Sequence, residues 1–329
     1  IKEIYYYEYL TINSKSSYMF SNEERPDIYV IGFQEIVSLN ANNLLISSNY
    51  ESLKKWKKLV IKTLDGIGKY SLIKTLDLVG LYQLIFIKTE LKENVRYLDS
   101  QIIKTGVMGT VGNKGSLIIK FSYLDTDLAF VCSHLSHGME GNKHRINELQ
   151  QILSKTIMMN GREVQLRNLD YLFIYGDLNF RIKYEDTLIK QLISIGRLEE
   201  LKPYDQLLQV LSTSTVFSDL SEGNITFDPT YKFTPGTSLY DTGKKREPAW
   251  CDRIIFNKLN KIEIVTYNSV YEYTQSDHKP VYGLFKLKIL SIDQLEREKL
   301  ILEYKKNATN DNKEINIFSK YLSLIHISE

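Results

Sequence analysis

The chain has 329 residues, 43% of them hydrophobic, which is enough for one large or two small domains with a sizeable core. Its 42 lysines and arginines nearly balance its 40 aspartates and glutamates, so the total charge calls for neither nucleic acid nor a membrane surface as partner. No apolar stretch is long enough to span a membrane, and no signal region opens the chain. Cys132 and Cys251 both lie in apolar runs, which is typical of reduced, buried thiols in an intracellular protein.

The start of the chain already has the content of a β-strand. The sequence opens on Ile1 rather than Met, and residues 4–10 are rich in aromatic side chains. We therefore expect the sequence to begin inside a domain and to be truncated at its start.

Signals for strands and helices follow along the chain. Apolar residues 28–31 predict a buried strand, and Leu53, Trp56 and Val60 recur at the spacing of an amphipathic helix. The polar residues 124–127 can close a hairpin. Further strands are predicted at residues 70–78, 81–89, 116–123, 128–133, 171–175, 250–256, 262–267 and 281–288. Helices are predicted at residues 51–64, 145–159, 188–195 and 292–304.

Nothing divides the first 288 residues into smaller units. Strands and helices interleave without the regular alternation of a parallel barrel, and no internal repeat or Pro/Gly-rich break interrupts them. We expect residues 1–288 to form one domain and residues 289–329 to form a helical and polar extension. Residues 322–329 are similar to translated sequencing-adapter sequence, so we exclude them from the predicted fold.

Polar side chains follow several apolar strands at the point where each strand ends. A fold that gathers these ends at one edge of a sheet would bring together Glu35, Asp177, Asn179, Asp252, Asp277 and His278. This set is rich in oxygen and free of sulfur, which suits Mg²⁺.

Seven short motifs in a fixed order carry a specific resemblance. They are Gly32-Phe33-Gln34-Glu35, Gly112-Asn113-Lys114-Gly115, Ser133-His134-Leu135, the heptapeptide 176–182, Pro229-Thr230-Tyr231-Lys232-Phe233, the hexapeptide 248–253 and Ser276-Asp277-His278-Lys279-Pro280. Together they resemble the inositol polyphosphate 5-phosphatases, and the match covers about residues 25–288.

The resemblance implies a fold and a chemistry. The family belongs to the endonuclease, exonuclease and phosphatase superfamily, so we expect an α+β, deoxyribonuclease-like α/β/β/α sandwich of two packed mixed sheets flanked by helices. Such enzymes hydrolyse phosphate esters with a divalent metal, here expected to be Mg²⁺, and without a covalent phosphoenzyme. The metal neutralises phosphate charge, and a water attacks in line with the leaving oxygen.

The resemblance also assigns catalytic roles to the residues at the strand ends. Glu35 matches the metal-binding glutamate, although alone it reads equally well as an exposed loop carboxylate. Asp177 and Asn179 lie two apart after a strand, so in extended backbone both face one side, where the aspartate activates the water and the asparagine orients it.

A carboxylate and imidazole pair is expected from the last two motifs. Asp252 would fix the tautomer of His278 and stabilise its protonated ring, which binds the scissile phosphate. Asp277 is expected to support the metal or the water network, with a turn cap as the alternative. His134 is expected to donate to a phosphate oxygen, whereas His137 and His144 are interpreted as surface residues.

Substrate selection falls to cations, because an inositol ring carries separated phosphate dianions. Asn113 and Lys114 lie in a glycine-flanked loop that lets backbone amides approach an anion. The remaining substrate-binding candidates match the family's segment for the phosphate adjacent to the one removed, and they are Tyr231, Lys232, Tyr240, Lys244 and Arg246. From charge alone, Lys244-Lys245-Arg246 reads as a solvated turn.

Three departures from the family pattern stand out. The family's first strand carries an asparagine beside the metal, and nothing in residues 1–26 matches it, so that strand is expected to be missing from the sheet. The segment between Asp241 and Pro248 is one residue shorter than the usual spacing. The apolar residues 44–46 are the nearest candidate for a contact with lipid chains, although such a run is more often part of a core.

We therefore expect a Mg²⁺-dependent hydrolase that removes the 5-phosphate from phosphoinositides and from soluble inositol polyphosphates. It is expected in the cytoplasm, peripheral at the cytosolic face of membranes, without a nucleic-acid partner or a transmembrane segment. A catalytically silent phosphoinositide-binding module is one alternative. A nuclease of the same superfamily is the other, and it would need a basic groove with aromatic platforms for a strand.

Overall fold

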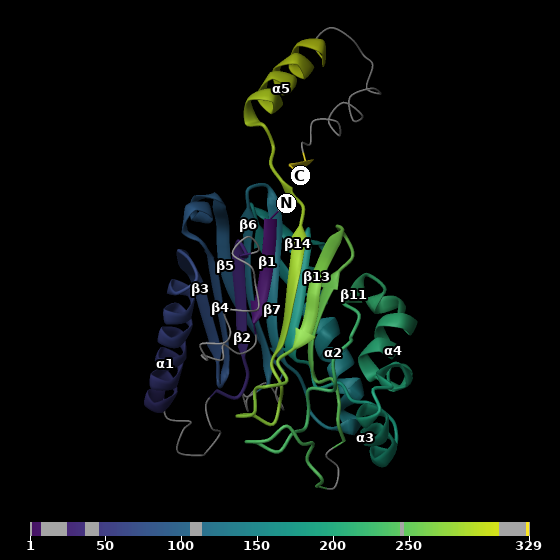
Figure 1. Ribbon diagram of the computed structural model, residues 1–329. Coiled ribbons are helices and arrows are strands. Elements are labelled where there is room, and N and C mark those ends of the chain that lie inside the picture. Colours follow the sequence, from purple (N-terminus) through teal and green to yellow (C-terminus); the bar gives the residue numbers. More distant parts are fainter. Residues whose placement is uncertain are drawn as a thin grey trace.

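Two six-stranded sheets pack face to face in the computed structural model, which describes residues 2–7, 25–36, 46–105, 114–243, 247–308 and 327–328 (Figure 1). The first sheet runs in the order β13 (Ile262–Ser269), β14 (Val281–Leu287), β1 (Lys2–Tyr7), β2 (Ile28–Phe33), β4 (Leu81–Lys88) and β3 (Tyr70–Leu78). The second runs β11 (Leu220–Glu222), β12 (Asp252–Asn257), β10 (Tyr171–Asp177), β7 (Thr126–His134), β6 (Gly115–Tyr123) and β5 (Val95–Lys104).

Helices cover the outer faces of the two sheets. Helix α1 (Ile46–Asp65) packs on the first sheet, and the second sheet is flanked by α2 (Asn142–Leu153), α3 (Asp186–Ser194) and α4 (Gln206–Thr213) (Figure 1). The resulting α/β/β/α layering is the architecture predicted from the sequence. No described helix is both long and apolar enough to cross a membrane.

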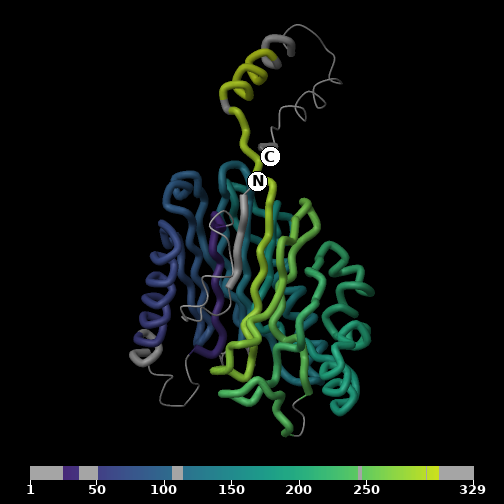
Figure 2. The backbone as a smooth tube through the Cα atoms, viewed as in Figure 1, coloured from purple at the N-terminus to yellow at the C-terminus, as the bar shows by residue number. Residues whose placement is uncertain are grey.

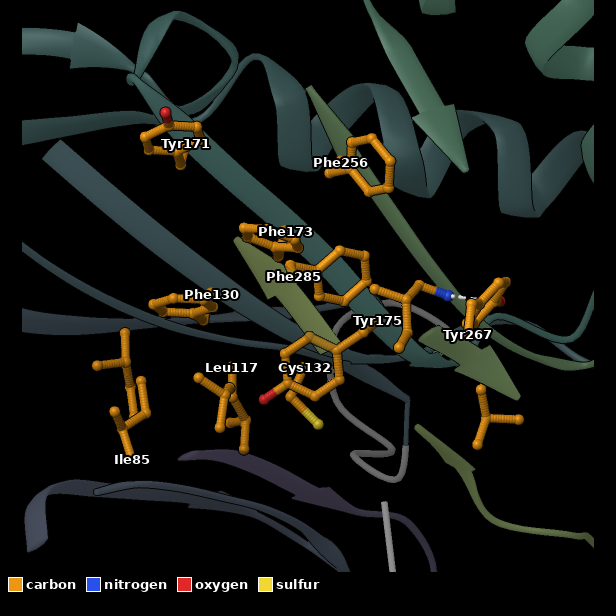
Figure 3. Close-up of a cluster of buried hydrophobic side chains, with 14 of the residues drawn as sticks. Ile85, Leu117, Phe130, Cys132, Tyr171, Phe173, Tyr175, Phe256, Tyr267 and Phe285 are labelled. Carbon is orange, nitrogen blue, oxygen red and sulfur yellow. Dashed lines mark hydrogen bonds between the residues drawn. The ribbon is translucent and has the colours of Figure 1, made fainter. Parts of the chain in front are cut away.

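The main core lies between the two sheets and contains many aromatic side chains among its aliphatic ones. Three rings meet there, from Phe130 of β7, Phe173 of β10 and Phe285 of β14 (Figure 3). The ring centroid of Phe173 lies 5.6 Å from that of Phe130 and 5.2 Å from that of Phe285. Strands β2 and β10 are buried on both faces, which explains why each reads as a continuous apolar run rather than an alternating one. Both cysteines are buried thiols, as predicted.

Strand register brings the functional ends together. Strand β10 pairs in parallel with β7 and antiparallel with β12, and this pairing places Asp177 opposite both His134 and Asp252. The two loops at residues 229–243 and 270–280 lie side by side at the same end of the sandwich, joined by a bridge between Tyr231 and His278 (Figure 2).

The expectation of a missing first strand is wrong. Strand β1 lies inside the first sheet, antiparallel to β14 and parallel to β2, with Tyr5 opposite Leu284 and Tyr29. A tyrosine-rich segment has the propensity to fill this interior position although it lacks the family's motif. The sheet therefore keeps its full width.

The predicted helix at residues 145–159 ends earlier than expected. Helix α2 stops at Leu153, and the following apolar residues form β8 (Thr156–Met159), paired with β9 (Arg162–Gln165). Asn160 and Gly161 between them have φ angles of 47° and 73°. An Asn-Gly pair is a strong signal for a hairpin turn, and it outweighs the helical spacing of the apolar residues before it.

The remaining predictions hold with small shifts at the element ends. Strand β5, helix α4 and the β8–β9 hairpin have no counterpart among the predicted elements. After β14 the chain forms β15 (Ile289–Leu290), which pairs with β16 (Ile327–Ser328), and α5 (Gln294–Ala308), which stands apart from the sandwich (Figure 1).

Candidate active site

Asp177 is the centre of a chain of polar contacts at the end of β10. Its Oδ2 lies 3.1 Å from Nε2 of His134, and the same nitrogen lies 3.9 Å from Oε1 of Glu35. His134 and Asp177 are almost completely buried, whereas the Glu35 side chain is 64% exposed. Three of the predicted residues, from three strand ends, are thus in one place.

Gly176 makes this close approach of β10 and β7 possible. Its φ is 116°, and a Cβ at this position would lie 2.3 Å from the carbonyl oxygen of Ser133 and 2.9 Å from Nε2 of Gln34. An L side chain is strained at this φ and has no space here. The glycine before Asp177 therefore lets the strands bring Asp177 beside His134.

Asn179 is held through its backbone N–H, its Nδ2 and its Oδ1. Its φ is 58°, and its backbone N–H donates to Oδ1 of Asp177 at 3.0 Å. Its Nδ2 donates to the carbonyl oxygen of Leu135 at 3.2 Å, and its Oδ1 accepts from Nη2 of Arg181 at 2.6 Å. Asp177 and Asn179 are thus hydrogen-bonded to each other, but the expected extended backbone is wrong, because β10 ends at Asp177 and Asn179 has a left-handed φ.

The predicted pair of Asp252 and His278 is also formed. Nδ1 of His278 lies 2.9 Å from Oδ2 of Asp252, and the hydroxyl of Thr230 donates to the same oxygen at 2.6 Å. Thr230 is fully buried and Asp252 is 2% exposed. With Nδ1 bonded to Asp252, Nε2 is the nitrogen left to meet a substrate.

Electrostatics set the protonation states of the two central groups. Burial alone would raise the pKa of Asp177, but the hydrogen bond from His134 and the nearby His278 and Lys114 outweigh it and hold that pKa well below its usual range. Burial alone would lower the pKa of His278, but Asp252 outweighs it, with Asp177 and Asp277, and raises that pKa to about 10. At neutral pH the site therefore contains an ionised Asp177 and a protonated His278.

Lys114 approaches the site from the start of β6. Its Nζ is in contact with Nε2 of His134. Burial lowers its pKa, against the opposing carboxylates of Asp177 and Glu35. The cation is thus poised beside the strand-end carboxylates, where an anionic group would be received.

Lys232 and Asp277 form an ion pair at the rim of the site. Nζ of Lys232 lies 2.9 Å from Oδ2 of Asp277, and the side chains are 19% and 35% exposed. The ring of Tyr231 lies 4.8 Å from that of His278. Asp277 therefore faces Lys232, and no contact with Glu35 or Asp177 is formed within the described residues.

The oxygen donors at the strand ends suit a hard divalent cation. Glu35 offers an exposed carboxylate near Asp177, and Mg²⁺ is commonly bound through one or two carboxylates with waters and substrate phosphates completing its shell. Among the described residues, no group of three or more His, Cys, Asp or Glu side chains closes around a metal position. The site therefore fits an open metal position rather than an all-protein cage.

The other predicted residues have varied locations. The phenol of Tyr240 donates to the carbonyl oxygen of Pro229 at 2.6 Å, and its ring stacks on Phe233 with centroids 4.3 Å apart, so it stabilises the loop. His137 and His144 are exposed, as predicted. Outside the described residues lie Asn113, Lys244, Arg246 and the apolar residues 44–45.

Two residues with contacts to the site were not predicted individually. Thr230 and Arg181 both lie inside motifs used for the resemblance, but a threonine and an arginine in isolation give no signal of a role. Their relevance follows from the contact of Thr230 with Asp252 in another segment and from the contact of Arg181 with Asn179 two residues before it.

Comparisons with known proteins show which family the chain belongs to. The model of the endonuclease/exonuclease/phosphatase family 2 matches residues 8–284. The chain is 37% identical over 287 residues to inositol-1,4,5-trisphosphate 5-phosphatase 1 of Schizosaccharomyces pombe, covering 86% of this chain and 26% of that protein. It is 32% identical over 305 residues to human synaptojanin-1, covering 84% of this chain and 19% of that protein. The chain thus spans about a quarter or less of these relatives.

A solved structure matches almost the whole chain. It is the inositol polyphosphate 5-phosphatase domain of SPsynaptojanin in complex with inositol (1,4)-bisphosphate and calcium ion, with a TM-score of 0.78 and 32% identity over 95% of this chain and 93% of that one. These matches show that the chain belongs to the endonuclease/exonuclease/phosphatase family 2 and, within it, to the inositol polyphosphate 5-phosphatases.

Proposed function

We propose that this chain is a Mg²⁺-dependent phosphomonoesterase that removes the 5-phosphate from inositol phosphates. The proposed substrates are phosphatidylinositol 4,5-bisphosphate or 3,4,5-trisphosphate and soluble inositol polyphosphates. The observation that carries the proposal is the meeting of two pairs, His134 with Asp177 and His278 with Asp252, at neighbouring strand ends. The inositol (1,4)-bisphosphate in the matching structure is what remains when the 1,4,5-trisphosphate loses its 5-phosphate.

The charged state of each group suits a direct attack by water. Ionised Asp177 accepts a hydrogen bond from the attacking water and aligns it, while Asn179 beside it orients the same water. Protonated His278 donates from Nε2 to the scissile phosphate, and Asp252 stabilises the charge that this requires. His134 donates to a second phosphate oxygen.

A divalent cation complements these residues. Glu35 would hold Mg²⁺, with Asp277 as a second supporting group through the water network. When bound, the metal neutralises charge on the phosphate and on the leaving oxygen. Uncatalysed hydrolysis of phosphate monoesters is so slow that the site must lower the barrier by about 20 kcal/mol, most of it electrostatic.

Specificity is proposed to come from the cations around the site. Lys114 stands beside His134, and Lys232 stands at the rim with Tyr231 next to it, so two phosphates on one ring can each meet a cation. Asn113, Lys244 and Arg246 remain predicted contributors. Residues 1–288 are proposed as the catalytic domain, with residues 289–329 as an extension, acting in the cytoplasm and at the cytosolic face of membranes.

Phosphate release from inositol 1,4,5-trisphosphate with Mg²⁺ tests the proposal. We expect the parent chain to release one phosphate and to leave the 1,4-bisphosphate, and Asp177→Asn to lose about 10²–10⁴-fold in kcat, as is usual when an acid–base group is removed. Asp219→Asn is the matched control, since Asp219 pairs with Arg167 at the surface. Liposome binding without turnover would instead support a silent lipid-binding module, and cleavage of DNA would support a nuclease.

A further inference from the structure

Asn179 presents a polar side chain whose orientation has to be fixed by its neighbours. The oxygen and nitrogen of an asparagine amide are nearly the same size, so a rotation by half a turn exchanges an acceptor for a donor. Asn179 is 2% exposed, and therefore bulk water cannot correct a wrong orientation. Whichever protein groups contact the amide decide which atom faces the reacting water.

Arg181 is the group that contacts the oxygen. Its Nη2 donates to Oδ1 of Asn179 at 2.6 Å, and its Nε donates to the backbone carbonyl oxygen of the same residue at 3.2 Å. One guanidinium thus holds both the side chain and the backbone of Asn179. A guanidinium has no acceptor, so only the oxygen of the amide can occupy this position.

The arginine itself is fixed from two sides. Its backbone N–H donates to Oε1 of Gln206 at 3.1 Å, and its carbonyl oxygen accepts from the backbone N–H of Gln206 at 2.9 Å. Its guanidinium lies over the ring of Tyr231, 4.4 Å from the ring centroid. The backbone of Arg181 is therefore held by the start of α4, and its planar guanidinium is held against the ring that stands next to His278.

With its oxygen held by Arg181, Asn179 has only N–H groups left to offer. One hydrogen on Nδ2 is used by the carbonyl oxygen of Leu135, and the described part of the chain supplies no acceptor for the other. We propose that Arg181 is a positioning residue that locks the Asn179 amide in the orientation that donates an N–H to the attacking water or phosphate. This inference rests on the proposed hydrolysis, because it assigns Asn179 its direction in that reaction.

A direct contact of Arg181 with the substrate is the competing explanation, and kinetics separate the two. If Arg181 acts through Asn179, Arg181→Met lowers kcat by about 10–100-fold with KM nearly unchanged, a loss typical of a residue that orients a functional ligand. Arg181→Lys should fall almost as far, since one ammonium cannot hold both oxygens. A large rise in KM that the lysine variant repairs would overturn the inference.

A double-mutant cycle tests whether Arg181 acts through Asn179. Arg181→Met in an Asn179→Ala background should cost no further activity, because the group that Arg181 positions is already gone. Losses that multiply would show that Arg181 acts independently of Asn179. Arg167→Met is the control, since Arg167 forms a comparable fork with Asp219 at the surface, away from the strand ends.

A second measurement needs no turnover. Asparagine-selective ¹⁵N labelling, with the signal assigned by its loss in Asn179→Ala, reports hydrogen exchange of the side-chain amide with Mg²⁺-free protein. In Arg181→Met the amide is free to turn and to break its Nδ2 bond to Leu135, so this exchange should speed about tenfold, the equivalent of one hydrogen bond. An unchanged exchange rate refutes the lock. If the parent chain hydrolyses no inositol phosphate, the proposed function fails, and the amide signal still decides the orientation.

Discussion

A cluster of buried charges surrounds the residue next to Asp252 in the sequence, and it leads to a sharp prediction. Arg253 follows Asp252 in β12 and is fully buried. Its Nη1 lies 3.0 Å from both carboxylate oxygens of Asp205, and its Nη2 lies 2.5 Å from Oε2 of Glu222. Both carboxylates are 2% exposed or less. Arg253→Met keeps much of the volume of the side chain and leaves two buried carboxylates without their cation.

The expected cost follows from the number of charges left unpaired. Breaking one buried ion pair typically costs about 3–5 kcal/mol, and here two carboxylates lose the same partner, so we expect a loss of at least about 3–5 kcal/mol in the free energy of unfolding. Asp205 also caps α4 by accepting from the backbone N–H of Leu208 at 2.9 Å. The helix start therefore remains held in the variant.

The pKa of Glu222 determines how the loss of stability in Arg253→Met depends on pH. Burial raises the pKa of Glu222 in the folded state even with Arg253 present. The contribution of Glu222 to stability is therefore fully present below its pKa in the unfolded state, and it is lost as pH rises through its pKa in the folded state. Without Arg253 the folded pKa rises further. The deficit of Arg253→Met should therefore be larger at pH 8 than at pH 5.

Denaturant unfolding at both pH values measures this prediction. Arg167→Met is the matched control, because its partner Asp219 is 35% exposed and surface pairs contribute only about 0–1 kcal/mol. Adding Asp205→Asn and Glu222→Gln to Arg253→Met should restore part of the loss. A deficit below about 1 kcal/mol at neutral pH, or one that is equal at both pH values, would refute the reasoning, since it would mean that the buried charges are not interacting as the structure shows.

Three further outcomes are expected. Gly176→Ala should lower the unfolding free energy by about 1–3 kcal/mol or more, since the new Cβ would meet the carbonyl oxygen of Ser133, and a variant as stable as the parent in denaturant would contradict this. Thr230→Val should lower kcat about fivefold with little change in Tm, because the loss of one hydrogen bond to Asp252 is equivalent to about 1 kcal/mol. An unchanged kcat in the phosphate-release assay would contradict this. Chelation with EDTA should abolish phosphate release, and added Mg²⁺ should restore it. Glu35→Gln should need Mg²⁺ concentrations about tenfold higher or more to reach half of its full activity, and equal titrations would show that Glu35 does not bind the metal.

Local patterns in the sequence were enough to predict much of the fold. Apolar runs mark β2 and β10 because both faces of these strands are buried, and such runs need no partner to be recognised. The end of α2 was misplaced, since the turn at Asn160 and Gly161 outweighs the helical spacing before it. The place of β1 was also missed, because sheet order depends on pairing between segments nearly the whole chain apart.

The sequence by itself determined the chemistry that is present. Asp177 and Glu35 follow apolar runs and His278 lies in an ordered motif, so these residues could be singled out from the sequence, and their roles are predicted through the resemblance. Only the tertiary structure decided which groups support them. Arg181 contacts Asn179 two residues before it, and Thr230 contacts Asp252 from a separate loop, and the residue types alone predict neither contact. The chemical groups of a side chain are fixed by the residue type. Its orientation and its pKa are set by the neighbouring groups, and folding is what brings those groups together.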